Sequence, residues 1–112
     1  MTRNMYELYE LGGERGRAAA AFTTFDTEDD ALALLVGRHE GDPEVCDIEP
    51  SWLSGEWAGE SLTELGLADA TDDELNEYEN GAHDAFWDTV FDAAYAKLSD
   101  ENRARFGGYP VN

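Results

Sequence analysis

Residues 71–99 carry the most regular pattern in the chain, and they limit most strongly how it can fold. Apolar and small side chains recur there at spacings of three and four, which is the repeat of an amphipathic α-helix. They are Leu75, Tyr78, Ala82, Ala85, Phe86, Thr89, Ala93 and Ala96. Thr71 precedes a run of acidic residues, so it provides an N-cap with an acidic first turn. We expect one long helix whose apolar side the rest of the chain must cover.

Glycines and β-favouring residues before this helix predict a small antiparallel sheet. Residues 5–11 run into two glycines and residues 16–25 end in Phe-Thr-Thr-Phe, so the two segments indicate a hairpin. Residues 43–48 indicate a third strand in which Cys46 is half-buried. The order is then β-β-α-β followed by helices. We therefore predict an α+β fold in which about three antiparallel strands pack against a helical layer that includes the long helix.

Shorter helices are expected on either side of the third strand and at the end of the chain. Asp26 and Thr27 form a cap, and apolar residues at helical spacing follow it up to Val36. This pattern stops near residues 37–41, where two glycines stand. Residues 102–106 favour one last helical turn.

Residues 51–60 are predicted to form a loop that holds two of the three tryptophans. A domain of this size needs large side chains to close its core, so Trp52 and Trp57 are interpreted as lids on the core rather than as ligand-stacking residues. Ser61 is expected to cap a short helix that ends at Gly66.

The composition is that of one folded domain over residues 1–112. The chain is 42% hydrophobic and contains 3 Trp, 5 Tyr and 5 Phe, too much apolar material for a chain kept unfolded by its charge. The lone Cys46 cannot form an internal disulfide. No segment has the apolar run of a signal peptide or of a membrane span, so we expect a cytoplasmic protein.

Negative charge is concentrated in one part of the chain. The net charge is −19, and residues 41–96 hold sixteen acids and no Lys or Arg. Packing a core requires no such block, and the block destabilises the compact state through self-repulsion. A chain of this kind repels nucleic acid and anionic lipid, so we expect it to bind neither directly. It attracts basic protein surfaces and cations.

The long helix is expected to carry a stripe of carboxylates opposite its apolar side. The stripe stacks like charges at helical spacing, which costs stability, whereas exposed helix faces normally pair Glu with Lys. Tyr95 projects beside it, as aromatic anchors do in interfaces. Acids of the tryptophan loop and of the following short helix would add a second row. The candidate partner-binding residues are Glu56, Glu60, Glu64, Asp73, Glu74, Glu77, Asp84, Asp88, Asp92 and Tyr95.

Catalytic, cofactor and metal motifs are missing from the sequence. His39 and His83 have no companion pattern of a nucleophile or a zinc site, and the glycines form no phosphate-binding loop. The acids of residues 69–79 lack the central glycine of a calcium loop. We expect neither an enzyme nor a cofactor or dedicated metal site.

The acid block and the aromatic residues around an acidic helix resemble, in charge pattern, the DNA-mimic inhibitors of phages and mobile elements. These include anti-restriction proteins of the ArdA kind and acidic anti-CRISPR proteins. The resemblance implies that carboxylates stand in for phosphates and occupy the Lys/Arg-lined channel of a defence nuclease, such as a CRISPR or restriction complex, or of another DNA-binding protein.

Two other interpretations fit the same composition. The acids of a salt-loving organism's protein keep it hydrated, and a single Lys beside six Arg suits that reading. Alternatively, an acidic regulatory or assembly domain binds a basic protein without imitating DNA. A homodimer also stays open as an oligomeric state.

Overall fold

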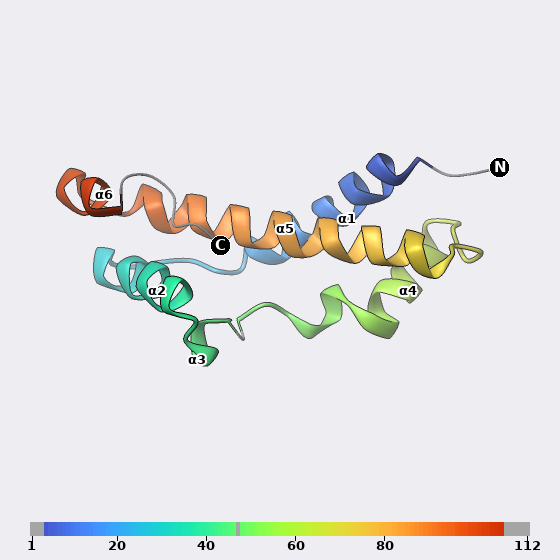
Figure 1. Cartoon of the computed structure of the whole chain (residues 1–112), viewed down its shortest axis with the longest axis horizontal. Coiled ribbons are helices and arrows are strands. Elements are labelled where there is room, and N and C mark those ends of the chain that lie inside the picture. Colours follow the sequence, from blue (N-terminus) through green and yellow to red (C-terminus); the bar gives the residue numbers. More distant parts are fainter. Residues whose placement is uncertain (1–3, 47, 107–112) are drawn as a thin grey trace.

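The computed structural model describes residues 4–46 and 48–106, and these residues form helices and connecting turns without any strand (Figure 1). The predicted α+β fold with an antiparallel sheet is therefore wrong. The elements are α1 (Met5–Ala20), α2 (Glu28–Glu40), α3 (Pro43–Cys46), the 3-10 helix η1 (Ser51–Leu53), α4 (Gly55–Glu64), α5 (Asp72–Ala96) and α6 (Asp100–Phe106).

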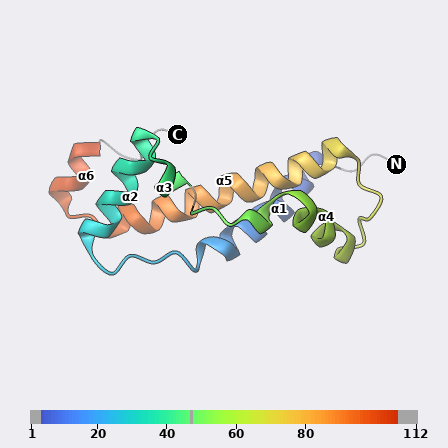
Figure 2. The same cartoon turned by 90° about the horizontal axis from the view of Figure 1, so that it is seen from below.

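The helices form a rod around α5, with Cα extents of 52 × 22 × 21 Å. α1 and α4 lie beside the N-terminal half of α5, whereas α2 and α6 lie near its C-terminal end (Figures 1 and 2). Glu28 links these last two helices, because its Oε1 accepts a hydrogen bond from the backbone N–H of Ser99 at 3.0 Å and another from the amide of Asn102. The N–H of Ser99 also lowers the pKa of Glu28.

The long helix predicted from residues 71–99 is confirmed as α5. Thr71 and Glu74 form the reciprocal hydrogen bonds of a capping box, at 3.2 Å from the Glu74 N–H and 2.9 Å from the Thr71 N–H. The apolar side of α5 buries Phe86, Trp87 and Val90. This helix is the central element against which the others pack.

The first predicted strand pair is instead the continuous helix α1, and three glycines explain the difference. A Cβ on Gly12 would lie 1.9 Å from the carbonyl oxygen of Tyr78, and one on Gly16 would lie 2.0 Å from that of Ala82. On the facing helix, a Cβ on Gly81 would lie 2.0 Å from the carbonyl oxygen of Tyr9. The three glycines thus mark a backbone-to-backbone contact between α1 and α5, and Gly12 and Gly16 do not form the predicted hairpin turn.

The third predicted strand is also wrong, because residues 43–46 form the short helix α3. Proline is favoured at the first helical position, and Pro43 occupies it. The carboxylate of Asp42 accepts a hydrogen bond from the N–H of Glu44 at 3.0 Å, which caps this turn. The preceding helix α2 starts after Thr27, as predicted, and ends at Gly41, whose φ of 77° is left-handed.

The segment predicted as a loop with core tryptophans contains η1 and the start of α4. Trp52 and Trp57 are 40% and 59% exposed, so neither is a lid on the core, which is filled by Trp87 instead. Ser61 lies inside α4 rather than at its start, and its hydroxyl shares a 2.7 Å hydrogen bond with the hydroxyl of Tyr78. The helix ends before Gly66 as expected.

Two groups of buried apolar residues occupy the two halves of the rod. The larger joins the C-terminal half of α5 to α2, to the end of α1 and to Leu53. The smaller joins Leu8 of α1, Ala58 and Leu62 of α4, and Tyr78 of α5.

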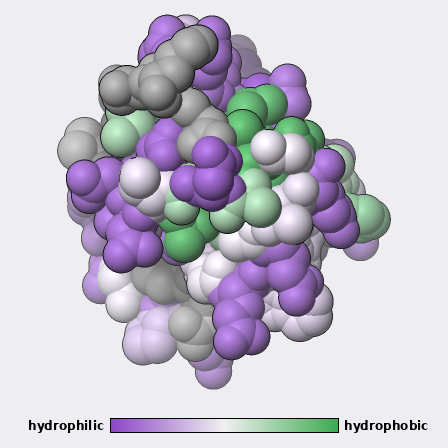
Figure 3. All heavy atoms as spheres, turned by 90° about the vertical axis from the view of Figure 1, so that its right-hand side faces the viewer, coloured by the Kyte–Doolittle hydropathy of each residue, from purple (hydrophilic) through white to green (hydrophobic). Residues whose placement is uncertain are grey.

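Seen from the end where α4 meets α5, hydrophilic side chains surround a small apolar area (Figure 3). Residues 4–46 and 48–106 include no helix with the length and apolar character required to cross a membrane.

Replacing the glycines at the helix contact is expected to destabilise the protein, although alanine is the better helix former. Gly12→Ala or Gly16→Ala gains about 1 kcal/mol of helix propensity. It must also move a backbone carbonyl, so we expect a net loss of about 2 kcal/mol or more in the free energy of unfolding. Urea unfolding followed by circular dichroism measures it.

Gly59→Ala is the matched control, since Gly59 lies inside α4 and a Cβ there meets nothing within 4 Å. We expect it to stabilise the protein by about 0.5–1 kcal/mol. A Gly12→Ala variant as stable as the Gly59→Ala variant would show that α1 and α5 do not touch through their backbones.

Candidate interface for a basic partner

Eleven carboxylates form three rows on three helices, which we call the acidic rows. Side chains three, four or seven residues apart project from the same side of a helix, and each row has this spacing. The rows are Glu7, Glu10 and Glu14 on α1; Glu56, Glu60 and Glu64 on α4; and Asp73, Glu77, Asp84, Asp88 and Asp92 on α5. All are exposed except Glu77, which is half-buried.

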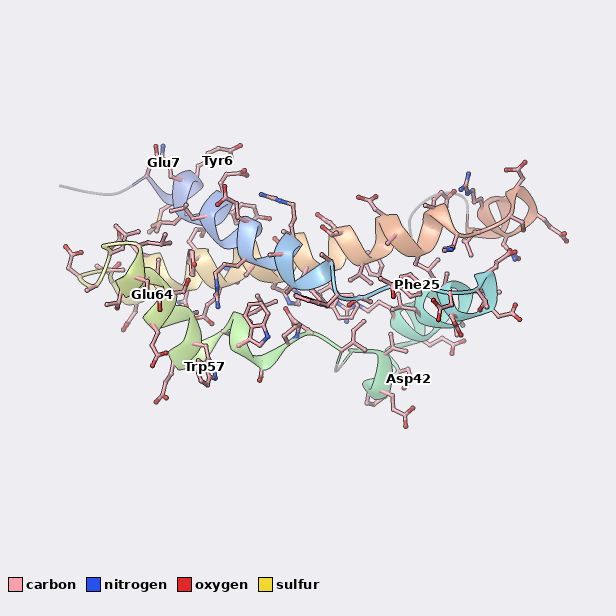
Figure 4. The ribbon with its side chains drawn as sticks, turned by 180° about the vertical axis from the view of Figure 1, so that it is seen from behind. Tyr6, Glu7, Phe25, Asp42, Trp57 and Glu64 are labelled. Carbon is pink, nitrogen blue, oxygen red and sulfur yellow. The ribbon has the colours of Figure 1, made fainter. Side chains whose placement is uncertain are left out.

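α1 lies between the other two rows. A groove of about 620 Å³ separates it from α4 and is lined by Arg15 on one side and by Glu60 and Glu64 on the other. A second groove of about 310 Å³ runs along the junction of α1 and α5, and Asp88 and Asp92 line it. Seen from behind, α1 and α4 run along the same stretch of the rod, with Glu7 and Glu64 near its end (Figure 4). The three rows therefore follow three neighbouring helices along the rod.

The acidic rows are not neutralised by the chain itself. Within the part of the chain that the structure describes, none of the eleven carboxylates forms an ion pair, and Asp84 alone accepts a side-chain hydrogen bond. Arg17 lines the groove between α1 and α5, so it offsets part of the local charge without pairing. Like charges at these spacings repel, and the fold tolerates that cost. The carboxylates thus stay available to an external cation.

The surroundings of Tyr9, between α1 and α5, favour its neutral form. Its hydroxyl donates a 2.5 Å hydrogen bond to Asp84. This bond, partial burial and the charges of Asp84, Asp88 and Glu77 raise the pKa of Tyr9 to about 12. A phenolate would add a further negative charge to the row, so the neutral form is favoured.

Two of the residues predicted for the interface have structural roles instead. Glu74 is 7% exposed, because its carboxylate closes the capping box of α5. Tyr95 is half-buried, and its ring centre lies 5.5 Å from the guanidinium carbon of Arg103. The hydroxyl of Tyr95 also donates a 3.5 Å hydrogen bond to the backbone carbonyl oxygen of Arg103. Neither side chain is free to anchor a partner. The other eight predicted residues belong to the acidic rows.

Sequence analysis missed the row on α1. Glu7, Glu10 and Glu14 follow one another at spacings of three and four, but the glycines between them were interpreted as a turn. Gly12 and Gly16 are themselves four residues apart, which places both on one side of a helix. That spacing was the signal that could have revealed the helix and its acidic side.

Metal-ligating side chains do not cluster in the described ranges. No group of three or more His, Cys, Asp or Glu side chains there is arranged to hold a metal ion. His83 is occupied by a 2.7 Å contact between its Nδ1 and the carboxylate of Glu49, which fastens the segment before η1 to α5.

No protein-family model, curated protein or solved structure matches this chain.

The tyrosine between α1 and α5 offers a direct test of its contact with Asp84. Tyr9 is expected to ionise near pH 12, and Asp84→Asn should bring its pKa back toward 10.0, because the charged acceptor is lost. The contact with Asp84 contributes stability in full below pH 10.0, and this contribution is lost as the pH rises through about 12.

The measurement is the phenolate absorbance as a function of pH, with Tyr9→Phe to identify the late component. If the titration curves of the parent and of Tyr9→Phe differ near pH 10.0 and not at higher pH, the proposed contact is wrong.

Proposed function

We propose that this protein is a binding module that imitates nucleic acid: its acidic rows occupy the Lys/Arg-lined channel of a nucleic-acid-binding protein and block it. A defence nuclease, such as a CRISPR or restriction complex, is the partner class that the resemblance to DNA-mimic inhibitors implies. The observation that carries the proposal is a set of eleven carboxylates, aligned in three rows on neighbouring helices, that have no cationic partner in the described chain.

The charge per unit length supports this proposal. A DNA duplex carries about one charge per 1.7 Å, so a 52 Å length has about 30 phosphates. The chain has 26 acidic residues and a net charge of −19 along a rod of that length. Its net charge is thus about two thirds of that of a duplex.

The arrangement of the rows supports it further. The row on α5 alone spans about 28 Å with five acids, whereas a duplex of this length has about 16 phosphates. The shorter rows on α1 and α4 lie beside the N-terminal half of α5 and raise the number of carboxylates to eleven. One helix carries too few carboxylates per unit length to imitate a duplex, but three helices together approach the charge density of its phosphates.

A surface of this kind accelerates association with a basic partner and makes the affinity depend on salt. Solvation in strong brine requires no alignment of carboxylates, so the arrangement favours a binding role over a halophilic surface. A protein that folds in 0.15 M NaCl agrees with binding. One that unfolds without molar salt supports the halophilic alternative.

Competition with DNA tests the mimicry. The immobilised protein is incubated with a lysate of the cells that produce it, and bound proteins are then eluted with duplex DNA. We expect DNA to release the captured partner, because both ligands occupy the same basic channel. We also expect its affinity to fall steeply between 50 mM and 500 mM salt, on the order of tenfold or more. Capture that DNA leaves unchanged would contradict mimicry and favour an acidic regulatory domain.

Charge-neutralising variants locate the interface. Glu10→Gln, Glu60→Gln and Asp88→Asn together remove one charge from each row, and we expect them to weaken partner binding about tenfold or more. The control is Glu40→Gln, Glu44→Gln and Glu101→Gln, which removes three equally exposed charges outside the rows. Affinities for the captured partner are measured by calorimetry. Equal losses of affinity in the two triple variants would show that binding depends on the total charge and not on the acidic rows.

A further inference from the structure

We infer that the groove between α1 and α4 is a binding site for an arginine side chain of the basic partner, which stacks on Trp57 and donates hydrogen bonds to Glu60 and Glu64. The inference rests on the proposed function, since it names the group that the acidic surface recognises. Its test is independent of DNA competition.

The groove combines aromatic and anionic side chains that the sequence places on one side of α4. Trp57, Glu60, Ser61 and Glu64 stand at positions i, i+3, i+4 and i+7, and all four line the same volume of about 620 Å³. Trp57 is 59% exposed. The groove therefore presents a solvent-exposed aromatic face next to two carboxylate acceptors.

Arg15 shows that this groove already accommodates one guanidinium. Its Cζ lies 5.5 Å from the ring centre of Trp52 and 5.4 Å from that of Tyr78. Its Nη2 donates a 2.6 Å hydrogen bond to the carbonyl oxygen of Trp52, and its Nη1 donates a 3.5 Å bond to that of Leu53. The chain therefore binds its own arginine by stacking and by oxygen acceptors. Trp52 is thereby occupied.

Trp57 and its two carboxylates have no such occupant. In the described part of the chain, Trp57 has no cation over its ring, and Glu60 and Glu64 have neither an ion pair nor a side-chain hydrogen bond. The hydroxyl of Ser61 is already bonded to Tyr78. With one arginine and two glutamates, the groove lining has a net charge of −1. It is a ready acceptor for a second cation.

Arginine fits this site better than lysine does. A guanidinium is planar and has five N–H donors, so it can stack on an indole and serve two carboxylates at once. An ammonium is a compact, strongly hydrated charge that gains less from the aromatic face. Charge also disfavours a second copy of this chain as the occupant, since two molecules of net charge −19 repel each other.

The test compares two eight-residue peptides, one alternating arginine with glycine and one alternating lysine with glycine. Isothermal titration calorimetry on the full chain at low salt measures both affinities. We expect the arginine peptide to bind about fivefold more tightly. Trp57→Ala should abolish this preference and Trp57→Phe should retain part of it. The exposure of Trp57 lets these variants fold, as circular dichroism can verify.

The carboxylates are tested with a charge-matched pair of double variants. Glu60→Gln with Glu64→Gln should weaken arginine-peptide binding at least threefold more than Glu10→Gln with Glu14→Gln does, although both remove two exposed charges. The inference is overturned if neither peptide binds the parent protein or if both bind it with equal affinity. It is also overturned if Trp57→Ala keeps the arginine preference, or if the two double variants lose the same amount of affinity for the arginine peptide.

The two proposals can fail separately. Peptide binding is measured without DNA and without the natural partner, so an arginine preference that depends on Trp57 supports the groove even where DNA does not release the partner. In that case nucleic-acid mimicry fails and the arginine site remains. The converse result is also distinct: DNA releases the partner, Trp57→Ala binds the partner as tightly as the parent protein does, and the peptides show no arginine preference. Nucleic-acid mimicry then stands, and the groove is not part of the interface.

Discussion

The backbone contact between α1 and α5 is the interaction on which the rest of this structure depends. Because Gly12 and Gly16 have no side chains, the carbonyl groups of Tyr78 and Ala82 can lie where a Cβ would otherwise stand. This approach fixes the rotation of α1 about its own axis. Leu8 then points into the core, whereas the acids at positions 7, 10 and 14 point outward. The glycines therefore place the middle row of carboxylates as well as half of the core.

The unpaired carboxylates are compatible with a stable fold, because their mutual repulsion is smaller than the stabilisation from buried apolar side chains. Like charges four residues apart on a helix cost about 0.2–0.5 kcal/mol per pair. Burial of a large apolar side chain contributes about 1.5–3 kcal/mol, and Tyr78, Phe86 and Trp87 are all fully buried on the opposite side of α5. Packing thus outweighs the repulsion within the acidic rows.

Sequence reasoning found the elements that local signals define and missed those that depend on distant contacts. The capping box at Thr71 and the left-handed Gly41 are local, and both helix ends were predicted correctly. Gly12 and Gly16 look like turn residues until the facing carbonyls of α5 are known, so α1 was predicted as two strands and its acidic row was lost. Trp57 was assigned to the core from its size alone, because no local pattern distinguishes a buried indole from one that borders a groove. Eight of the ten candidate interface residues nevertheless lie in the acidic rows, since the spacing of acids on α4 and α5 is itself local.

The rows and the groove act over different distances, and this difference explains why both would be needed. Exposed charges attract a basic surface only within about a Debye length, roughly 8 Å at physiological salt, and they do so with little regard to whether the cation is lysine or arginine. Selectivity requires contact, where shape and hydrogen-bond geometry matter. Trp57, Glu60 and Glu64 supply a planar surface and two acceptors at the edge of one row. The rows would bring a basic partner to the rod, and the groove would decide which of its side chains is held.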